Sequence, residues 1–159
     1  MATNTNSKSN DLTSKELLQR AVDLVPVLKS RAAHTEEIRR VPSETVQDFL
    51  SSGIHRIGVP PRFGGLDLDY GLSLDISAEL ARGCAASSWC YALWSAHSYL
   101  VGHWPLEAQE EVFGEGPDTL CSSSLNAGKS TTQQVNGGYR LNGRREVSSG
   151  CDSADWLML

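Results

Sequence analysis

The chain has 159 residues, of which 40% are hydrophobic, 21% charged and 7% aromatic, a composition typical of a soluble globular domain. Its 14 basic and 19 acidic residues give a net charge of -5 without a long run of either sign, which argues against a nucleic-acid partner. No apolar stretch approaches the roughly 20 residues that a membrane span needs. The polar start has neither a signal-peptide core nor twin arginines, so we expect a cytoplasmic protein with no membrane partner.

The first part of the chain is predicted to be helical. Thr13-Ser-Lys-Glu16 has the form of a capping box, and apolar residues then recur at helical spacing, which predicts a helix over 14–39. Pro42 is well placed to open a second helix that ends near residue 52. Prolines and glycines punctuate 54–70, a pattern that predicts an ordered loop.

Three further helices are expected, over 71–82, 88–102 and 105–113. The second of these carries apolar residues around most of its circumference, so it should be largely buried. Ser87 or Ser88 could cap its start, because a serine hydroxyl accepts hydrogen bonds from the first free backbone amides of a helix.

Beyond the helices the residue pattern changes to one typical of short strands, which are expected at 120–125, 131–135, 139–142, 144–147 and 155–159. Asn136-Gly137 is a strong two-residue hairpin turn, because both residues tolerate positive φ. The fold class is therefore α+β: a disordered start (1–12), an all-α helical domain (13–116) and the first strands of a β-barrel domain (117–159). Because so few strands make a poor independent sheet, the sequence is expected to stop within that β domain.

The four cysteines are irregularly spaced and lack close pairs such as CxxC. We expect reduced thiols that fill small buried spaces, and neither a disulfide framework nor a metal site.

His97 is the most interesting single side chain, because it lies one turn from Trp94 on a helix that should be buried. A buried imidazole beside aromatic rings can bind a phenol or accept its proton near neutral pH. The more common role of such a histidine is to satisfy a core hydrogen bond. His103 lies six residues further on and points elsewhere, so the two cannot form a helical metal pair. His34 and His55 are expected on the surface or in loops.

Two runs of small polar residues could meet the polar edge of a planar cofactor. They are Cys121-Ser-Ser-Ser124 and Ser148-Ser149-Gly150. Serine runs of this kind are more often solvated loops. Neither run contains a nucleophile elbow, a GxxxxGK loop or a GxGxxG fingerprint, so hydrolase, kinase and Rossmann functions lack support.

Five segments carry a family resemblance: Val59-Pro-Pro-Arg-Phe-Gly-Gly-Leu66, Ala78-Glu-Leu-Ala-Arg-Gly-Cys84, Ser88-Trp-Cys-Tyr-Ala-Leu-Trp-Ser-Ala-His97, Gly137-Gly-Tyr-Arg-Leu-Asn-Gly-Arg144 and Ser148-Ser-Gly-Cys-Asp-Ser-Ala-Asp-Trp156. In order and spacing they resemble the acyl-CoA dehydrogenase superfamily, and within it the two-component flavin-dependent monooxygenases that act on aromatic compounds. At the position where dehydrogenases usually have a sequence like Lys-x-Trp-Ile-Thr-Asn, this chain has Arg145-Glu-Val-Ser-Ser-Gly150. The sequence of this chain is similar there to that of the oxygenase branch.

The resemblance implies a reduced flavin, FMN or FAD, as cofactor and no metal. Ser149 would contact the N5 region of the flavin, with Ser148 beside it. Ser123 or Ser124 would line the isoalloxazine and the substrate side. His97 would then help to orient or deprotonate the substrate.

The substrate implied by the resemblance is a small aromatic compound, which Trp94, His97 and Ser124 would bind. A separate flavin reductase would supply the reduced flavin, O₂ would be the second substrate, and the full-length form would be a homotetramer. Family members continue into a completed sheet domain and a helical bundle, so this chain alone is expected to bind flavin weakly or not at all. Two alternatives stay open: an acyl-CoA dehydrogenase, and a helical remnant without catalytic activity.

Overall fold

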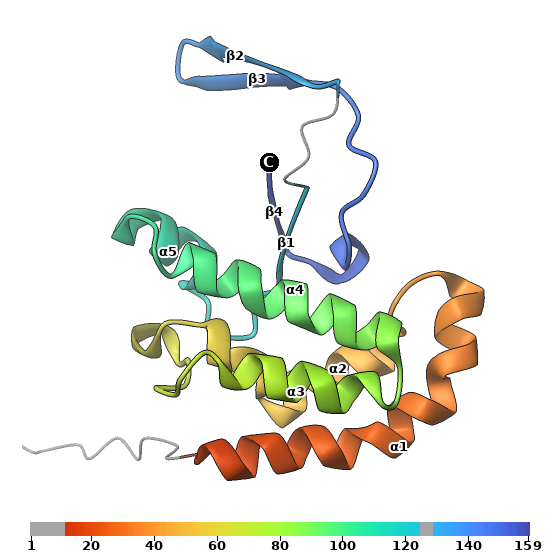
Figure 1. Cartoon of the computed structure of the whole chain (residues 1–159). Coiled ribbons are helices and arrows are strands. Elements are labelled where there is room, and N and C mark those ends of the chain that lie inside the picture. Colours follow the sequence, from red (N-terminus) through yellow and green to blue (C-terminus); the bar gives the residue numbers. More distant parts are fainter. Residues whose placement is uncertain (1–11, 125–128) are drawn as a thin grey trace, which may run out of the picture.

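The computed structural model describes residues 12–124 and 129–159, and it confirms an α+β fold in which helices precede short strands (Figure 1). The expected disordered start lies almost wholly outside the described residues, and the domain boundaries stay a prediction. The helices are α1 (Ser14–Ile38), α2 (Ser43–Ser52), α3 (Leu72–Ala81), α4 (Ala85–Val101) and α5 (Leu106–Phe113), with the 3₁₀ turns η1 (Ile54–Gly58) and η2 (Pro61–Phe63) after α2. None of the described helices is long and apolar enough to span a membrane.

The start of α1 has the predicted capping box. The Thr13 hydroxyl accepts a hydrogen bond from the Glu16 amide at 3.2 Å, and the Glu16 carboxylate accepts one from the Thr13 amide at 2.8 Å. Two backbone donors that would otherwise lack partners at the helix end are therefore satisfied.

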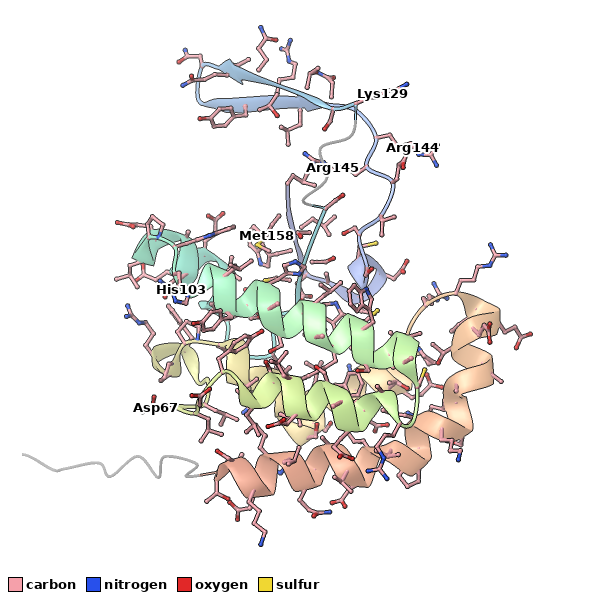
Figure 2. The ribbon with its side chains drawn as sticks, in the orientation of Figure 1. Asp67, His103, Lys129, Arg144, Arg145 and Met158 are labelled. Carbon is pink, nitrogen blue, oxygen red and sulfur yellow. The ribbon has the colours of Figure 1, made fainter. Side chains whose placement is uncertain are left out.

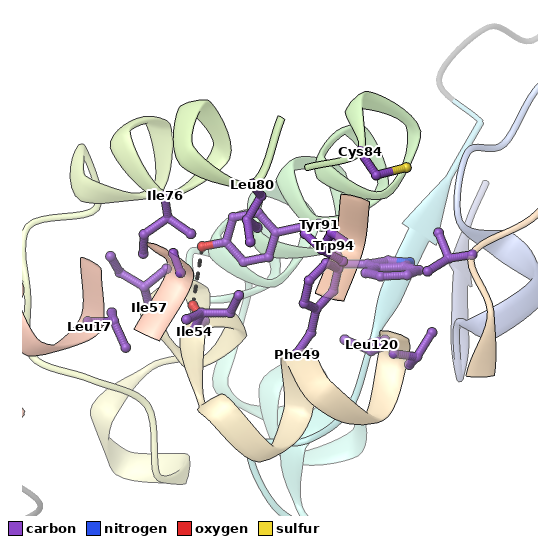
Figure 3. Packing of buried hydrophobic residues seen from close by; sticks show 14 residues of the cluster. Leu17, Phe49, Ile54, Ile57, Ile76, Leu80, Cys84, Tyr91, Trp94 and Leu120 are labelled. Carbon is purple, nitrogen blue, oxygen red and sulfur yellow. Dashed lines mark hydrogen bonds between the residues drawn. The ribbon is translucent and has the colours of Figure 1, made fainter. Parts of the chain in front are cut away.

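The hydrophobic core lies where α4 packs against α1, α2, α3 and η1 (Figure 3). Phe49 meets Tyr91 and Trp94 edge-on, with ring centroids 5.9 and 6.5 Å apart, a geometry that aromatic rings favour. The buried Tyr91 hydroxyl donates to the Ile54 carbonyl at 3.2 Å, and burial raises the pKa of this phenol. These contacts hold α4 rigidly on one side, which matters because the other side carries the candidate site.

Two expectations for α4 were wrong. The helix begins at Ala85, so Ser88 lies inside it, and its hydroxyl donates to the Ser77 carbonyl at 2.6 Å instead of capping the end. The helix is also only partly buried, because Trp89, Tyr99 and Leu100 lie on a face that the described residues leave open to solvent.

The strands form two separate pairs. β1 (Cys121–Ser123) pairs with β4 (Trp156–Met158) in parallel, whereas β2 (Thr131–Val135) and β3 (Gly138–Asn142) form an antiparallel hairpin. Val135 pairs with Gly138, which confirms the two-residue turn between them. Figure 1 shows this hairpin projecting away from the helices.

The strand expected at 144–147 does not form. In its place an irregular segment leads from β3 back to the helices and to the 3₁₀ turn η3 (Cys151–Ser153). Within this segment the Arg145 guanidinium donates to the Ser124 carbonyl at 2.7 Å.

All four cysteines carry free thiols, and Cys84 and Cys121 are buried as expected. Burial raises the pKa of the half-buried Cys90 thiol to about 11. The expectation was wrong for Cys151, which is exposed because it begins η3 at the surface. Among the described residues, no group of three or more His, Cys, Asp or Glu side chains could hold a metal ion.

His34 is exposed, whereas His55, which lies in the 3₁₀ turn η1 within the expected loop, is buried. The His55 ring is only 3% exposed, with Nε2 lying 3.0 Å from Asp118 Oδ1 and Nδ1 lying 3.3 Å from the Phe49 carbonyl oxygen. The Arg56 guanidinium donates to both oxygens of the same carboxylate. Burial lowers the pKa of His55, and the negative charge of Asp118 opposes that shift.

Replacing Asp118 with Asn tests this balance, because it removes the charge and keeps the size of the side chain. The pKa of His55 should fall further below its ordinary value, as followed by NMR titration of the imidazole. A lowered pKa in the folded state means that stability is present above about pH 6.5 and is lost as the pH falls through the folded pKa. Thermal unfolding should therefore show a steeper loss at acid pH in Asp118→Asn.

The matched control for this variant is His97, which binds Cys121 and Ser123 rather than Asp118. Its titration should not move. A His55 pKa that rises or stays unchanged would contradict the role assigned to the carboxylate.

Candidate active site

Three segments that are distant in sequence meet on one side of α4. The helix contributes a histidine and two tryptophans, β1 and the residue after it contribute three serines, and the segment before η3 contributes two more serines. The side chains predicted for the site are Trp94 and His97 from α4, Ser123 and Ser124 from the first serine run, and Ser148 and Ser149 from the second.

His97 and Ser123 form a buried pair. The imidazole is 5% exposed, its Nδ1 lies 3.3 Å from the Cys121 carbonyl oxygen, and its Nε2 lies 2.8 Å from the Ser123 hydroxyl oxygen. Because a carbonyl only accepts hydrogen bonds, Nδ1 carries the proton, and the Nε2 lone pair is left to accept the proton of Ser123. Burial lowers the pKa of His97, against a smaller opposing effect of the Cys121 carbonyl, so the neutral ring is favoured.

The two serine runs are bonded directly to each other. The Ser148 hydroxyl donates to the Ser123 carbonyl at 2.9 Å, and the Ser122 hydroxyl donates to the Ser149 carbonyl at 2.9 Å. The hydroxyl oxygens of Ser122 and Ser148 lie 3.0 Å apart. These bonds hold the segment around residue 148 against β1 although no strand forms there.

Two indole groups of α4 hold the end of the second serine run. Trp89 Nε1 donates to the Ser149 hydroxyl oxygen at 3.2 Å, and Trp94 Nε1 donates to the Gly150 carbonyl at 3.0 Å. Gly150 has φ +77°, and a β-carbon at this position would lie 2.4 Å from Trp94 Nε1. Both the backbone angle and the close approach therefore require glycine.

A pocket of about 790 Å³ opens beside these indole groups, between the end of α1, the start of α4 and the segment that includes the second serine run. Trp94, Ser148 and Ser149 line it, but His97, Ser123 and Ser124 do not. Hydrogen bonds thus connect the predicted residues into one network, while only half of them face this cavity.

Among the described residues, the bonds of Ser124 are made by its backbone. Its side chain is buried, and its backbone binds Arg145 through the carbonyl and, at 3.4 Å, Met158 through the amide. Figure 2 shows Arg145 pointing from the returning segment toward β1, whereas Arg144 points away into solvent. Ser124 is therefore held next to the site by its backbone.

Sequence reasoning assigned no role to Trp89 and Ser122, which both belong to the network. Ser122 lies inside a serine run already singled out. Trp89 lies five residues before Trp94, so helical spacing places the two on different faces, and only the position of residues 149 and 150 explains why both reach the same segment.

The protonation of His97 can be checked directly. Because the Cys121 carbonyl requires a proton on Nδ1, we expect the Nδ1–H tautomer at neutral pH in ¹⁵N NMR of the imidazole. Ser123→Ala should keep this tautomer, because the carbonyl contact remains. An Nε2–H tautomer in the unaltered chain would contradict the assignment.

Gly150→Ala should destabilise the fold by about 2–4 kcal/mol, because a strained backbone angle adds to overpacking against the indole. Gly137→Ala is the matched control, since its φ is +83° and nothing lies within 4 Å of an added β-carbon. The control should therefore show only the backbone cost, about 1 kcal/mol. Equal losses in chemical denaturation would contradict the close approach to Trp94.

Comparisons with known proteins agree with this architecture. The family "Acyl-CoA dehydrogenase, N-terminal domain" matches residues 15–113, nearly the whole helical part. The oxygenase subunit HsaA of a flavin-dependent monooxygenase from Mycobacterium tuberculosis is 37% identical over 87% of this chain and 35% of its own length. The oxygenase component of an FADH(2)-dependent resorcinol hydroxylase from Rhizobium sp. is 35% identical over 89% of this chain and 34% of its own length.

Solved structures show the same likeness. The crystal structure of HsaA from M. tuberculosis superposes with a TM-score of 0.86 at 35% identity, covering 92% of this chain and 40% of that one. XiaF from Streptomyces sp., in complex with FADH2 and glycerol, gives a TM-score of 0.84 at 28% identity over 91% of this chain and 36% of that one. The chain thus spans about a third of the length of the curated relatives it matches. On this match, which confirms the resemblance of its motifs, the chain belongs to the acyl-CoA dehydrogenase family.

Proposed function

We propose that this chain forms the helical part and the first strands of the oxygenase component of a flavin-dependent monooxygenase, which hydroxylates a small aromatic compound with reduced flavin and O₂. The observation that carries the proposal is the hydrogen-bonded network that joins His97, Ser123, Ser148 and Ser149 beside a pocket. The two curated relatives reported above are named as an oxygenase subunit and an oxygenase component, which supports the assignment.

The serine-lined edge suits the ring system of a flavin. Among the residues that the structure describes, none accepts the proton of the Ser149 hydroxyl, so this group is available to a ligand in the pocket. Trp89 and Val147 line the same pocket and offer apolar surface to a planar ring. Ser149 would therefore hold the polar edge of the flavin, with Ser148 beside it and Ser123 and Ser124 at the far end of the network.

Bound reduced flavin would supply the electrons that activate O₂. FAD is the form proposed here, because one relative is named as FADH(2)-dependent and the XiaF structure contains FADH2. A partner reductase would deliver it, in keeping with the oxygenase-component names, and the complete protein would act as a homotetramer in the cytoplasm.

His97 is proposed to accept or hold the proton of an aromatic hydroxyl, with Trp94 beside it and Ser124 near the ring. The lowered pKa favours the neutral imidazole, and the Cys121 carbonyl holds Nδ1–H, so Nε2 is the basic atom. The Ser123 hydroxyl is hydrogen-bonded to Nε2. For His97 to accept a proton from the substrate, this hydroxyl must rotate away or relay the proton. The burial of His97 and Ser123 suits this chemistry because exclusion of water protects reactive flavin species.

Binding is tested on the protein encoded by the whole reading frame that contains these codons, by anaerobic titration with chemically reduced FAD. Removing one hydrogen-bonding hydroxyl costs about 1 kcal/mol, so Ser149→Ala should weaken binding about fivefold. Ser43→Ala, on the exposed start of α2, is the matched control and should bind like the unaltered chain. If that protein folds and binds no reduced FAD, a non-catalytic helical module would be favoured.

Turnover is tested on the protein encoded by the whole reading frame that contains these codons, supplied with a flavin reductase, NADH and FAD. We expect hydroxylated products from a panel of phenols. Release of hydrogen peroxide without product across the panel would contradict the proposal. Bleaching of bound flavin by an acyl-CoA without O₂ would instead support an acyl-CoA dehydrogenase.

A further inference from the structure

The segment 148–150 is held from two sides, by β1 and by α4. On the β1 side, Ser122 donates to the Ser149 carbonyl, which fixes the backbone. On the α4 side, Trp94 donates to the Gly150 carbonyl, which again fixes the backbone. Trp89 instead bonds a side chain, the hydroxyl of Ser149, and Ser149 is one of the residues that line the pocket.

The direction of this bond determines what the hydroxyl can offer. An indole N–H only donates, whereas a serine hydroxyl has one proton and two lone pairs. Trp89 therefore occupies one lone pair of Ser149 and cannot take its proton. The proton and the second lone pair remain for a ligand, and both residues line the 790 Å³ pocket in which that ligand would lie.

Core packing does not account for Trp89. Its side chain is 61% exposed, whereas Trp94, five residues later on the same helix, is 2% exposed. The N–H of an exposed indole ordinarily donates to water, and such a bond does not restrict the conformation of the side chain. Here the N–H is directed to a residue 60 positions away, at a hydroxyl whose proton has no acceptor among the described residues.

We propose that Trp89 is a positioning residue for Ser149: its indole N–H holds the serine hydroxyl in one rotamer, with the hydroxyl proton presented to the ring edge of a flavin in the pocket. The inference rests on the proposed function for the identity of the ligand. The orientation of Ser149 is a property of this chain, and it can be tested without any ligand.

The first test uses the full chain and the variant Trp89→Phe, which keeps an aromatic ring and removes the N–H. NMR measurement of the Hα–Hβ couplings of Ser149 should show one staggered rotamer in the unaltered chain and an average of rotamers in the variant. Trp104→Phe is the matched control, since Trp104 is also largely exposed (43%) and outside the network, and it should leave the couplings unchanged. Unchanged couplings in Trp89→Phe would overturn the proposal.

The second test compares affinities for reduced FAD in a double-mutant cycle, made in the protein encoded by the whole reading frame that contains these codons. Trp89→Phe should weaken binding about fivefold, and it should have no further effect once Ser149 is replaced by Ala. A merely structural role of the ring would give the same loss in both backgrounds, which would count against positioning. If no variant binds FAD, the proposed function fails, and the Ser149 couplings still decide the role of Trp89.

Discussion

Trp94 is the side chain on which the arrangement of the site depends. Its ring is 2% exposed and packs edge-on against Phe49 in the core, while its N–H holds the Gly150 carbonyl. Trp94 therefore fixes the position of the segment at Gly150, which has no regular secondary structure, relative to the helices. Without this indole, the core would contain a cavity and the carbonyl would lose its donor, so stability and site geometry are coupled at one position.

The network that extends from Trp94 contains no ion pair among the described residues. It consists of indole N–H groups, hydroxyls, carbonyls and one neutral imidazole, His97. A hydroxyl that rotates can exchange its donor and acceptor roles. A proton can therefore be exchanged within the network without separating a buried charge pair. The other buried histidine is in the opposite situation, because His55 shares a carboxylate with Arg56, which is suited to holding two chain segments together. Two imidazoles of similar burial are thus distinguished by their partners.

Local patterns in the sequence were sufficient for the elements whose cause is local. The capping box at Thr13 and the turn at Asn136-Gly137 depend on neighbouring residues, and both were predicted correctly. The errors concern distant partners. The buried His55 ring contacts Asp118, 63 positions away, and no strand forms at 144–147, where Arg145 binds the carbonyl of residue 124.

The candidate site shows the same difference between local features, which the sequence reveals, and long-range contacts, which it does not. Each serine run could be found in the sequence, but their contact depends on hydrogen bonds between residues 25 to 27 positions apart, which no periodicity reveals. The family resemblance of the motifs was what grouped these residues into one site. The contributions of Trp89 and Ser122 could be recognised only from the geometry.

The parallel pairing of β1 with β4 has a consequence for how the chain folds. The Leu120 amide binds the Asp155 carboxylate across 35 positions, whereas the bond from Trp94 to Gly150 spans 56. Once the two short strands have paired, the chain that must be ordered to bring Gly150 to α4 is shorter, which lowers the entropic cost of closing that loop. The helices, whose contacts are more local, can form first. We therefore expect the site to be assembled last, and cooperatively: the strand pair and the indole bonds each make the other easier to form.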